Sequence, residues 1–352
     1  MIEIDGSILE GGGQILRTSV AMSAITGTPV KISKIRAKRD NPGLQAQQMA
    51  AVSAVAKLVD AKVTGLQKGS YTVEFIPQKI RNGSFKVDVG TAGSISLIFQ
   101  ALSPVACFAP GEVALELTGG TDVPWSPSFD YLNLVFIPTL RKLGCKISAE
   151  LIRRGHYPKG GGIVRFRFNP VTDRLKSISL DEFGEVENVK GVSHATRLPS
   201  HVATRQADSA KDALTRSGYG NIQIEISHKE DQLDYLSPGS GITLCASTTK
   251  GALVGADALG EKGKPAEKVG TEVAERLLAY LDKKCTVDSN LSDMLIPYMA
   301  TAEGESTIST SELSLHAKTN ITVTEKFLKT KFEVSEHNGL TSISCKGTGL
   351  GR

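Results

Sequence analysis

One succession of structural elements recurs along this chain, and it limits the folds that the chain can adopt. Strand-like segments, glycine-rich turns and helix-like segments follow one another in the same order from residue 2, from residue 85 and again after residue 264. Each copy spans roughly 70–80 residues and contains two helices and a small sheet. We therefore expect an α+β protein whose core consists of three repeated units, each with two helices and four strands.

The first two copies show the local signals on which this prediction rests. Residues 2–5 alternate in polarity like a strand, and the glycine turn at residues 11–13 opens a helix that Gly27 ends. A second helix is expected directly after Pro42, because proline suits the first turn of a helix. In the second copy, Ser94 opens a helix, and two strands flank a turn at residues 156–162.

A segment with a different order of elements and a more polar composition separates the second copy from the third. It begins with an acidic stretch at residues 181–187, continues with a long polar helix at residues 199–217, and ends with three strand-like runs. We interpret it as a small inserted α/β domain. The predicted division is 1–180 for the first two core units, 181–262 for the insertion and 263–352 for the third core unit.

The composition excludes several classes of protein. Hydrophobic residues make up 40% and charged residues 22%, as in globular proteins. No apolar run approaches the roughly 20 residues that span a membrane. Residues 1–13 lack the features of a signal peptide, so we expect a cytoplasmic protein without a membrane partner. The five cysteines are widely spaced, which argues against a zinc site or a disulfide framework.

The charge is compatible with a polyanionic partner without requiring one. The net charge is +4, and five lysine and arginine residues lie between positions 31 and 40. Such a cluster binds phosphates in some proteins and protects the edge of a sheet in others. Both interpretations stay open at this stage.

Three segments carry residues suited to chemistry. The glycine turn before residue 14 would let backbone N–H groups approach an anion at a helix N-terminus, with Arg17 one turn further on. The glycine-rich turn at residues 154–163 is not a P-loop, because the G-x-x-x-x-G-K-[ST] pattern is absent. His316 is expected between a strand and a helix, exposed at the mouth of a site, and Asp293 could orient its ring.

The chain resembles the RNA 3'-terminal phosphate cyclase family over nearly its whole length. The R-G-x-x-P-x-G-G-G signature at residues 154–162 is the most specific of the shared blocks. The other blocks are EGGGQILR at 10–17, IRAKRDNPGLQAQQ at 35–48, GTAGSISLIFQ at 90–100, GGTDVPWSP at 119–127, GKPAEKVG at 263–270, SDMLIPYMA at 292–300 and the segment around His316.

The resemblance implies a fold of three βαβαββ-type units with a small inserted domain. It also implies an RNA-processing enzyme of the ligase class that converts an RNA 3'-phosphate to a 2',3'-cyclic phosphate, with ATP consumed to AMP and pyrophosphate. The intermediates would be a covalent histidine–AMP and then an RNA–adenylate. The substrates would be ATP and RNA with a 3'-phosphate end, and a homodimer is one option for the assembly.

The family's site residues map onto individual positions of this chain. His316 would be the nucleophile, Asp293 would orient it, and Glu10 would bind a divalent cation, Mg or Mn. ATP and its phosphates would be bound by Glu10, Gln14, Arg17, Arg36, Gln47, Gln100 and Pro127. Asn290 stands where a relative has an aromatic residue, a departure that bears on how the base is stacked.

Four other interpretations are weaker. A lysine-dependent adenylating ligase would need K-x-D-G, but Glu3 stands where that lysine is required. A non-enzymatic assembly factor would not need His316. An enolpyruvyl-transferase-like enzyme is an analogy at the level of the fold only. A metal site on His194, His201 and His228 lacks a short ligand spacing, so we expect structural or surface histidines there.

Overall fold

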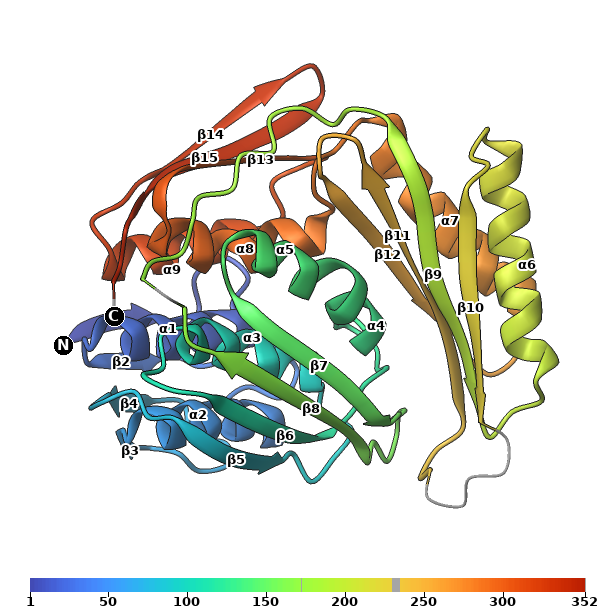
Figure 1. The fold of residues 1–352 in the computed structure, drawn as a ribbon. Helices are drawn as coiled ribbons and strands as arrows, with labels where there is room; N and C mark the ends of the chain where they lie inside the picture. The colour runs from blue at the N-terminus through green and yellow to red at the C-terminus, as the bar shows by residue number, and fades with distance from the viewer. Residues whose placement is uncertain (172, 230–234, 352) are drawn as a thin grey trace.

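The computed structural model describes residues 1–171, 173–229 and 235–351. It has a mixed α+β architecture with three four-stranded sheets and one three-stranded sheet. In the core, helices fill the centre and sheets cover them, whereas the long helix at residues 201–216 lies on the outside of the molecule (Figure 1). None of the helices in the described part of the chain is long and apolar enough to cross a membrane.

The first unit follows the predicted succession of elements. Gly27 ends α1 in the left-handed conformation, with φ 66°, as expected for a glycine at a helix C-terminus. The second helix begins later than predicted, because Gly43 has φ 77°, which no helix accommodates. The elements are β1 (Ile2–Asp5), α1 (Gly13–Thr26), β2 (Val30–Ser33), α2 (Ala46–Val59), β3 (Lys62–Thr64) and β4 (Val73–Ile76).

The second unit repeats the sheet of the first. The strand orders are β1-β2-β4-β3 and β5-β6-β8-β7, and in both sheets the first pair is parallel and the other two are antiparallel. Ser94 caps α3 by accepting a hydrogen bond from the Leu97 N–H. The elements are β5 (Gly83–Asp88), α3 (Ile95–Cys107), β6 (Val113–Gly119), α4 (Phe129–Tyr131), the π-helical η1 (Leu132–Phe136), α5 (Ile137–Lys142), β7 (Lys146–Arg153) and β8 (Gly162–Asn169).

The third unit departs from the predicted four strands. Its sheet has three strands in the order β13-β15-β14. Lys176 and Ser179 form parallel bridges with Glu303 and Thr307 of β13, where a first strand would lie. This arrangement suggests a third copy whose first strand is reduced to isolated bridges, and the threefold repeat stays a prediction. The elements are α8 (Ser289–Thr301), β13 (Glu303–Thr310), α9 (Leu315–Phe327), β14 (Phe332–His337) and β15 (Leu340–Thr348).

The insertion forms its own sheet, in the order β10-β9-β11-β12. Two helices, α6 and α7, pack against each other and against this sheet (Figure 1). The sequence analysis assigned residues 266–281 to the third core unit, but the apolar side of α7 is buried with the inserted sheet. The elements are β9 (Val186–Thr196), α6 (His201–Arg216), β10 (Ile222–Lys229), β11 (Gly239–Thr248), β12 (Leu253–Leu259) and α7 (Ala266–Asp282).

Two hydrophobic cores account for this arrangement. The larger core joins the helices and sheets of all three units, and the smaller one lies between the inserted sheet and α6 and α7. Asp288, the N-cap of α8, links the two layers. Its carboxylate accepts hydrogen bonds from the Tyr131 hydroxyl at 2.6 Å and from the Gly255 N–H at 2.9 Å. A buried carboxylate is therefore one of the links between the insertion and the core; Ser128 forms others, to Asp257 at 2.7 Å and to Thr243 at 2.9 Å.

The packing of α7 can be tested with Leu277→Ala. Leu277 is fully buried in the smaller core, and its truncation should lower the free energy of unfolding by about 2–5 kcal/mol. Hydrogen exchange should quicken in β11 and β12 while β13 and β15 stay protected. Glu275→Ala, on the exposed side of the same helix, is the control and should change stability by less than about 0.5 kcal/mol. Loss of protection in β13 instead would place α7 with the third unit.

Candidate active site

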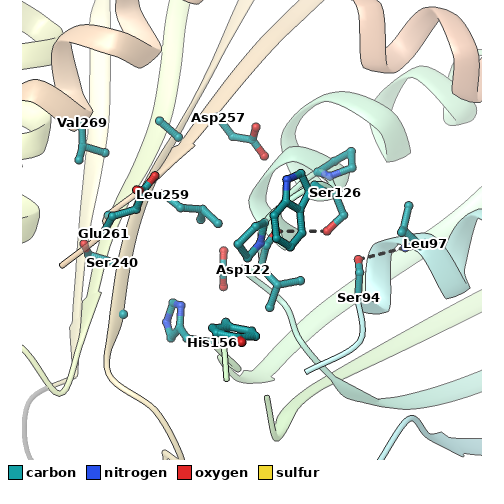
Figure 2. A pocket seen from close by; sticks show the side chains of 18 of the residues that line it. Ser94, Leu97, Asp122, Ser126, His156, Ser240, Asp257, Leu259, Glu261 and Val269 are labelled. Carbon is teal, nitrogen blue, oxygen red and sulfur yellow. Dashed lines mark hydrogen bonds between the residues drawn. The ribbon is translucent and has the colours of Figure 1, made fainter. Parts of the chain in front are cut away.

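A cavity of about 1580 Å³ separates the core from the inserted sheet. In Figure 2, Ser240, Leu259 and Glu261 of the inserted segment lie across the space from Ser94 and Leu97 of the core. All nine site residues named from the sequence line this cavity: Glu10, Gln14, Arg17, Arg36, Gln47, Gln100, Pro127, Asp293 and His316. They come from all three core units.

Three helices direct their N-terminal turns at the cavity. Gly13 and Gln14 begin α1, Asn290 and Asp293 lie early in α8, and His316 is the second residue of α9. Unpaired N–H groups and the helix dipole make such ends favourable for anions. The core wall of the cavity is therefore suited to a negatively charged ligand.

Glu10 shapes the glycine turn before α1. Its carboxylate accepts a hydrogen bond from the Gly12 N–H at 2.7 Å and forms an ion pair with Arg39. A Cβ atom on Gly12 would overlap both of these side chains. Glycine at position 12 thus allows a buried carboxylate to fold back over its own backbone.

Arg17 is a buried cation with spare hydrogen-bonding capacity. It donates to the Gln14 side-chain oxygen, and Gln14 in turn donates to Asn320 Oδ1 at 2.9 Å. Its Nε has no hydrogen-bond partner within the described residues, and neither has Gln100 Oε1. Burial lowers the pKa of Arg17 to about 10, so the side chain stays charged at neutral pH. A buried guanidinium of this kind favours an anionic ligand.

Arg36 and Gln47 are held partly by the protein itself. Arg36 donates to the carbonyls of Asn41 and Gly43, the latter at 3.1 Å. Gln47 Oε1 accepts a hydrogen bond at 2.9 Å from the Ser94 N–H, at the start of α3. Both side chains are thereby fixed in position at the cavity wall.

His316 is exposed, as the sequence predicted, and it faces the cavity. Ser314 caps α9 in front of it by accepting a hydrogen bond from the Ala317 N–H at 2.9 Å. Desolvation by the surrounding walls lowers the pKa of His316; the Glu10 carboxylate raises it, and Arg17 and Arg39 lower it. The imidazole is therefore neutral at pH 7, the form with a free lone pair.

Asp293 lies half-buried in the same wall. Burial raises its pKa to about 8, against the opposing effect of the Arg17 charge. No hydrogen bond joins its carboxyl group to His316 in the described part of the chain. Its proposed role in orienting the histidine stays a prediction.

Several residues at the cavity were given no role by the sequence analysis. Arg39 and Trp125 stand inside the blocks 35–48 and 119–127, and Trp125 is 95% exposed. Asp122 and His156 lie next to each other in Figure 2. His194, which was expected to be structural or on the surface, is buried beside them. Spacing along the chain gave no signal for this cluster, because its members come from three distant segments.

Comparison with known proteins is consistent along the whole chain. The model of the RNA 3'-terminal phosphate cyclase family matches residues 8–334. An RNA 3'-terminal phosphate cyclase of Pyrobaculum aerophilum is 49% identical over 352 residues, covering 100% of this chain and 99% of the relative. One of Ignicoccus hospitalis is 52% identical, covering 93% of each. Among solved structures, the enolpyruvyl transferase NikO of Streptomyces tendae matches over 97% of this chain and 81% of the NikO chain. The TM-score is 0.22 and the sequence identity 11%, which is too little to support an argument.

The electrostatic environment of His316 can be measured by titrating its ring protons by NMR, assigned with His316→Gln. Arg39→Met removes a positive charge that disfavours the imidazolium ion, so the pKa of His316 should rise. Lys38→Met is the matched control, since Lys38 binds the Leu9 carbonyl and does not perturb His316. A pKa that is unchanged in Arg39→Met would show that Arg39 does not act on the ring.

Proposed function

The chain belongs to the RNA 3'-terminal phosphate cyclase family, and we propose that it works through a covalent histidine–AMP on His316. The enzyme converts an RNA 3'-phosphate end to a 2',3'-cyclic phosphate, and ATP is consumed to AMP and pyrophosphate. One observation carries the proposal. A neutral histidine at a helix N-terminus faces a cavity together with Arg17, Arg36 and Glu10.

Adenylylation is the first step. An unprotonated ring nitrogen of His316 attacks the α-phosphorus of ATP, a P–N bond forms, and the bond to the β-phosphate breaks as pyrophosphate leaves. Arg17 and Arg36 bind the phosphates, and the spare Nε of Arg17 adds a donor as negative charge develops. The N-terminal turn of α1 contributes to the same anion site.

Two transfers complete the reaction. An oxygen of the RNA 3'-phosphate attacks the α-phosphorus of the histidine–AMP, and the P–N bond breaks to return His316 and give an RNA–adenylate. The neighbouring 2'-hydroxyl then gives its proton to water and attacks the 3'-phosphorus; the bond from that phosphorus to AMP breaks, AMP leaves as the phosphate anion, and the ring closes. Because the ribose holds the 2'-oxygen next to the phosphorus, this last step is effectively intramolecular.

A divalent cation, Mg or Mn, fits the residues around Glu10. The Glu10 carboxylate lines the cavity, and hard cations of this kind are commonly held by one or two carboxylates together with substrate phosphates. When bound, such a cation would neutralise charge on the triphosphate. Glu10 would have to share its oxygens with the Gly12 N–H and Arg39, which already hold the side chain in position.

The remaining residues of the cavity wall have supporting parts in the proposal. Gln14, Gln47 and Gln100 give neutral hydrogen bonds to the nucleotide, and Asp293 orients His316. Pro127 and Asn290 line the same cavity and would flank the base. The exposed ring of Trp125 lies in that wall two residues before Pro127 and offers an aromatic surface. The cytoplasmic location and a homodimer stay predictions.

Labelling with α-labelled ATP and a divalent cation tests the covalent step. The wild-type protein should form an acid-labile, alkali-stable protein–AMP adduct that RNA 3'-phosphate discharges into a cyclic end, and His316→Ala should form none. His337→Ala, an exposed histidine of β14, is the control and should label normally. If the folded wild type forms no adduct and releases no pyrophosphate with RNA present, His316 is not an adenylylated nucleophile.

Trp125 allows ligand entry to be observed directly, because it is the only tryptophan of the 352 residues. Binding of ATP should cover the ring, shift its emission to shorter wavelength or quench it, and saturate at one nucleotide per chain. His316→Ala should retain the change, since it blocks chemistry rather than entry. Saturable binding measured calorimetrically without any change in emission would place the nucleotide away from Trp125.

A further inference from the structure

A second cluster of polar side chains lies where the inserted sheet meets the core. Asp122 follows β6, His156 stands in the turn between β7 and β8, and His194 lies near the end of β9. All three side chains are buried, and one ligand atom from each lies within 4.8 Å of the others. No step of the proposed reaction uses them.

The nitrogens of the two histidines are left without partners. His156 Nε2 and both ring nitrogens of His194 make no hydrogen bond within the described residues. A buried polar atom without a partner is costly, and native structures rarely leave three in one place. A further component between the rings would satisfy these nitrogens, and a metal ion would do so by accepting their lone pairs.

The surroundings orient both rings for one shared ligand. The His156 ring hydrogen-bonds the backbone of Asp122, and its Nε2 is the nitrogen left free. His194 Nδ1 lies 3.7 Å from Asp130 Oδ2, and its Nε2 lies 3.8 Å from Asp122 Oδ1. Metal-binding histidines characteristically direct one nitrogen at the ion and the other at a carbonyl or carboxylate.

Two glycines of the inserted sheet leave space for the rings of His156 and His194. Gly239 and Gly241 of β11 lie directly against them, because a Cβ atom on Gly239 would overlap the His156 ring and one on Gly241 would lie 2.9 Å from His194 Cε1. The two imidazoles are stacked with centroids 5.4 Å apart and an interplanar angle of 27°. Ligand atoms around one zinc ion are about 3.3 Å apart, so modest ring rotations would close the site.

The positive charge of Arg154 lies next to this cluster and would repel a cation bound there. It forms ion pairs with Asp122 at 3.2 Å and with Asp130 at 2.8 Å. The two carboxylates together outweigh the one guanidinium, which leaves the cluster with a net negative charge to offset. Thr121 donates to Asp122 Oδ2 at 2.6 Å. Asp122 Oδ1 lies 3.8 Å from His194 Nε2 and accepts a hydrogen bond from Arg154 at 3.3 Å, so a metal ion would share this oxygen with the guanidinium.

We propose that Asp122, His156 and His194 bind one divalent transition-metal ion of the zinc class, which joins the inserted sheet to the core. Two imidazoles and a carboxylate suit zinc and its neighbours better than magnesium or calcium. Asp122 and His156 line the cavity (Figure 2), whereas His194 is not among the residues that line it. The coordination position left open would therefore face the cavity. This site is separate from the cation proposed at Glu10.

The test uses full-length, nucleotide-free protein stripped with a chelator and titrated with Co²⁺, whose visible absorption reports its coordination. One Co²⁺ should bind per chain, Zn²⁺ should displace it, and chelation should lower the Tm of the wild type by several degrees. His156→Ala should lose the Co²⁺ spectrum and the response of Tm to chelation. Asp130→Asn should weaken Co²⁺ binding by about 10–100-fold, since Asp130 would orient His194.

Two control variants distinguish this site from a surface histidine and from the cation at Glu10. His201→Ala, an exposed histidine on α6, and Glu10→Gln should both keep the Co²⁺ spectrum. The wild-type Tm measurement remains informative even if a variant fails to fold. The proposal is overturned if the folded wild type binds no Co²⁺ at a 1:1 ratio and its Tm does not change when Zn²⁺ is added. That result would leave a buried water as the occupant of the site. It is also overturned if His156→Ala keeps the wild-type spectrum.

Discussion

The contact between α1 and α9 is the one on which the rest of the site depends. Asn320 Oδ1 of α9 accepts hydrogen bonds from Gln14 Nε2 at 2.9 Å and from the Thr18 hydroxyl at 2.6 Å, both on α1. These bonds are buried and join residues about three hundred positions apart in the chain. They fix the relative rotation of the two helices, so Glu10 and His316 face the same cavity.

Electrostatic preorganisation follows from this packing. Arg17 of α1 has an unpartnered Nε, and its charge together with desolvation keeps His316 neutral. Burying the Arg17 guanidinium lowers the stability of the folded state through the loss of its hydration, and binding of an anion would offset this desolvation free energy. The histidine that we propose as nucleophile and the buried guanidinium that we propose as phosphate ligand are both positioned by the same helix contact.

Local signals and family blocks predicted much of this structure. Helical spacing and Gly27 located α1, the signals around Ser94 located α3, and the shared blocks identified nine residues that line one cavity. Features that depend on packing were missed. The sequence of α7 is compatible with either core, and its contacts with α6, β11 and β12 place its apolar side in the smaller core. His194 meets Asp122 and His156 through the fold alone, so no spacing could have revealed the cluster.

The dependence of the site on α9 has a consequence for synthesis. The ribosome releases the chain from the N-terminus, so α1 emerges long before α9, and the larger core that joins all three units is complete only when the third unit has been translated. Until α9 emerges, Gln14 and Thr18 have no Asn320 to bind, and the turn before α1 lacks the histidine that we propose as nucleophile. A nascent or prematurely terminated chain therefore has the turn of α1 without the opposite wall of the cavity.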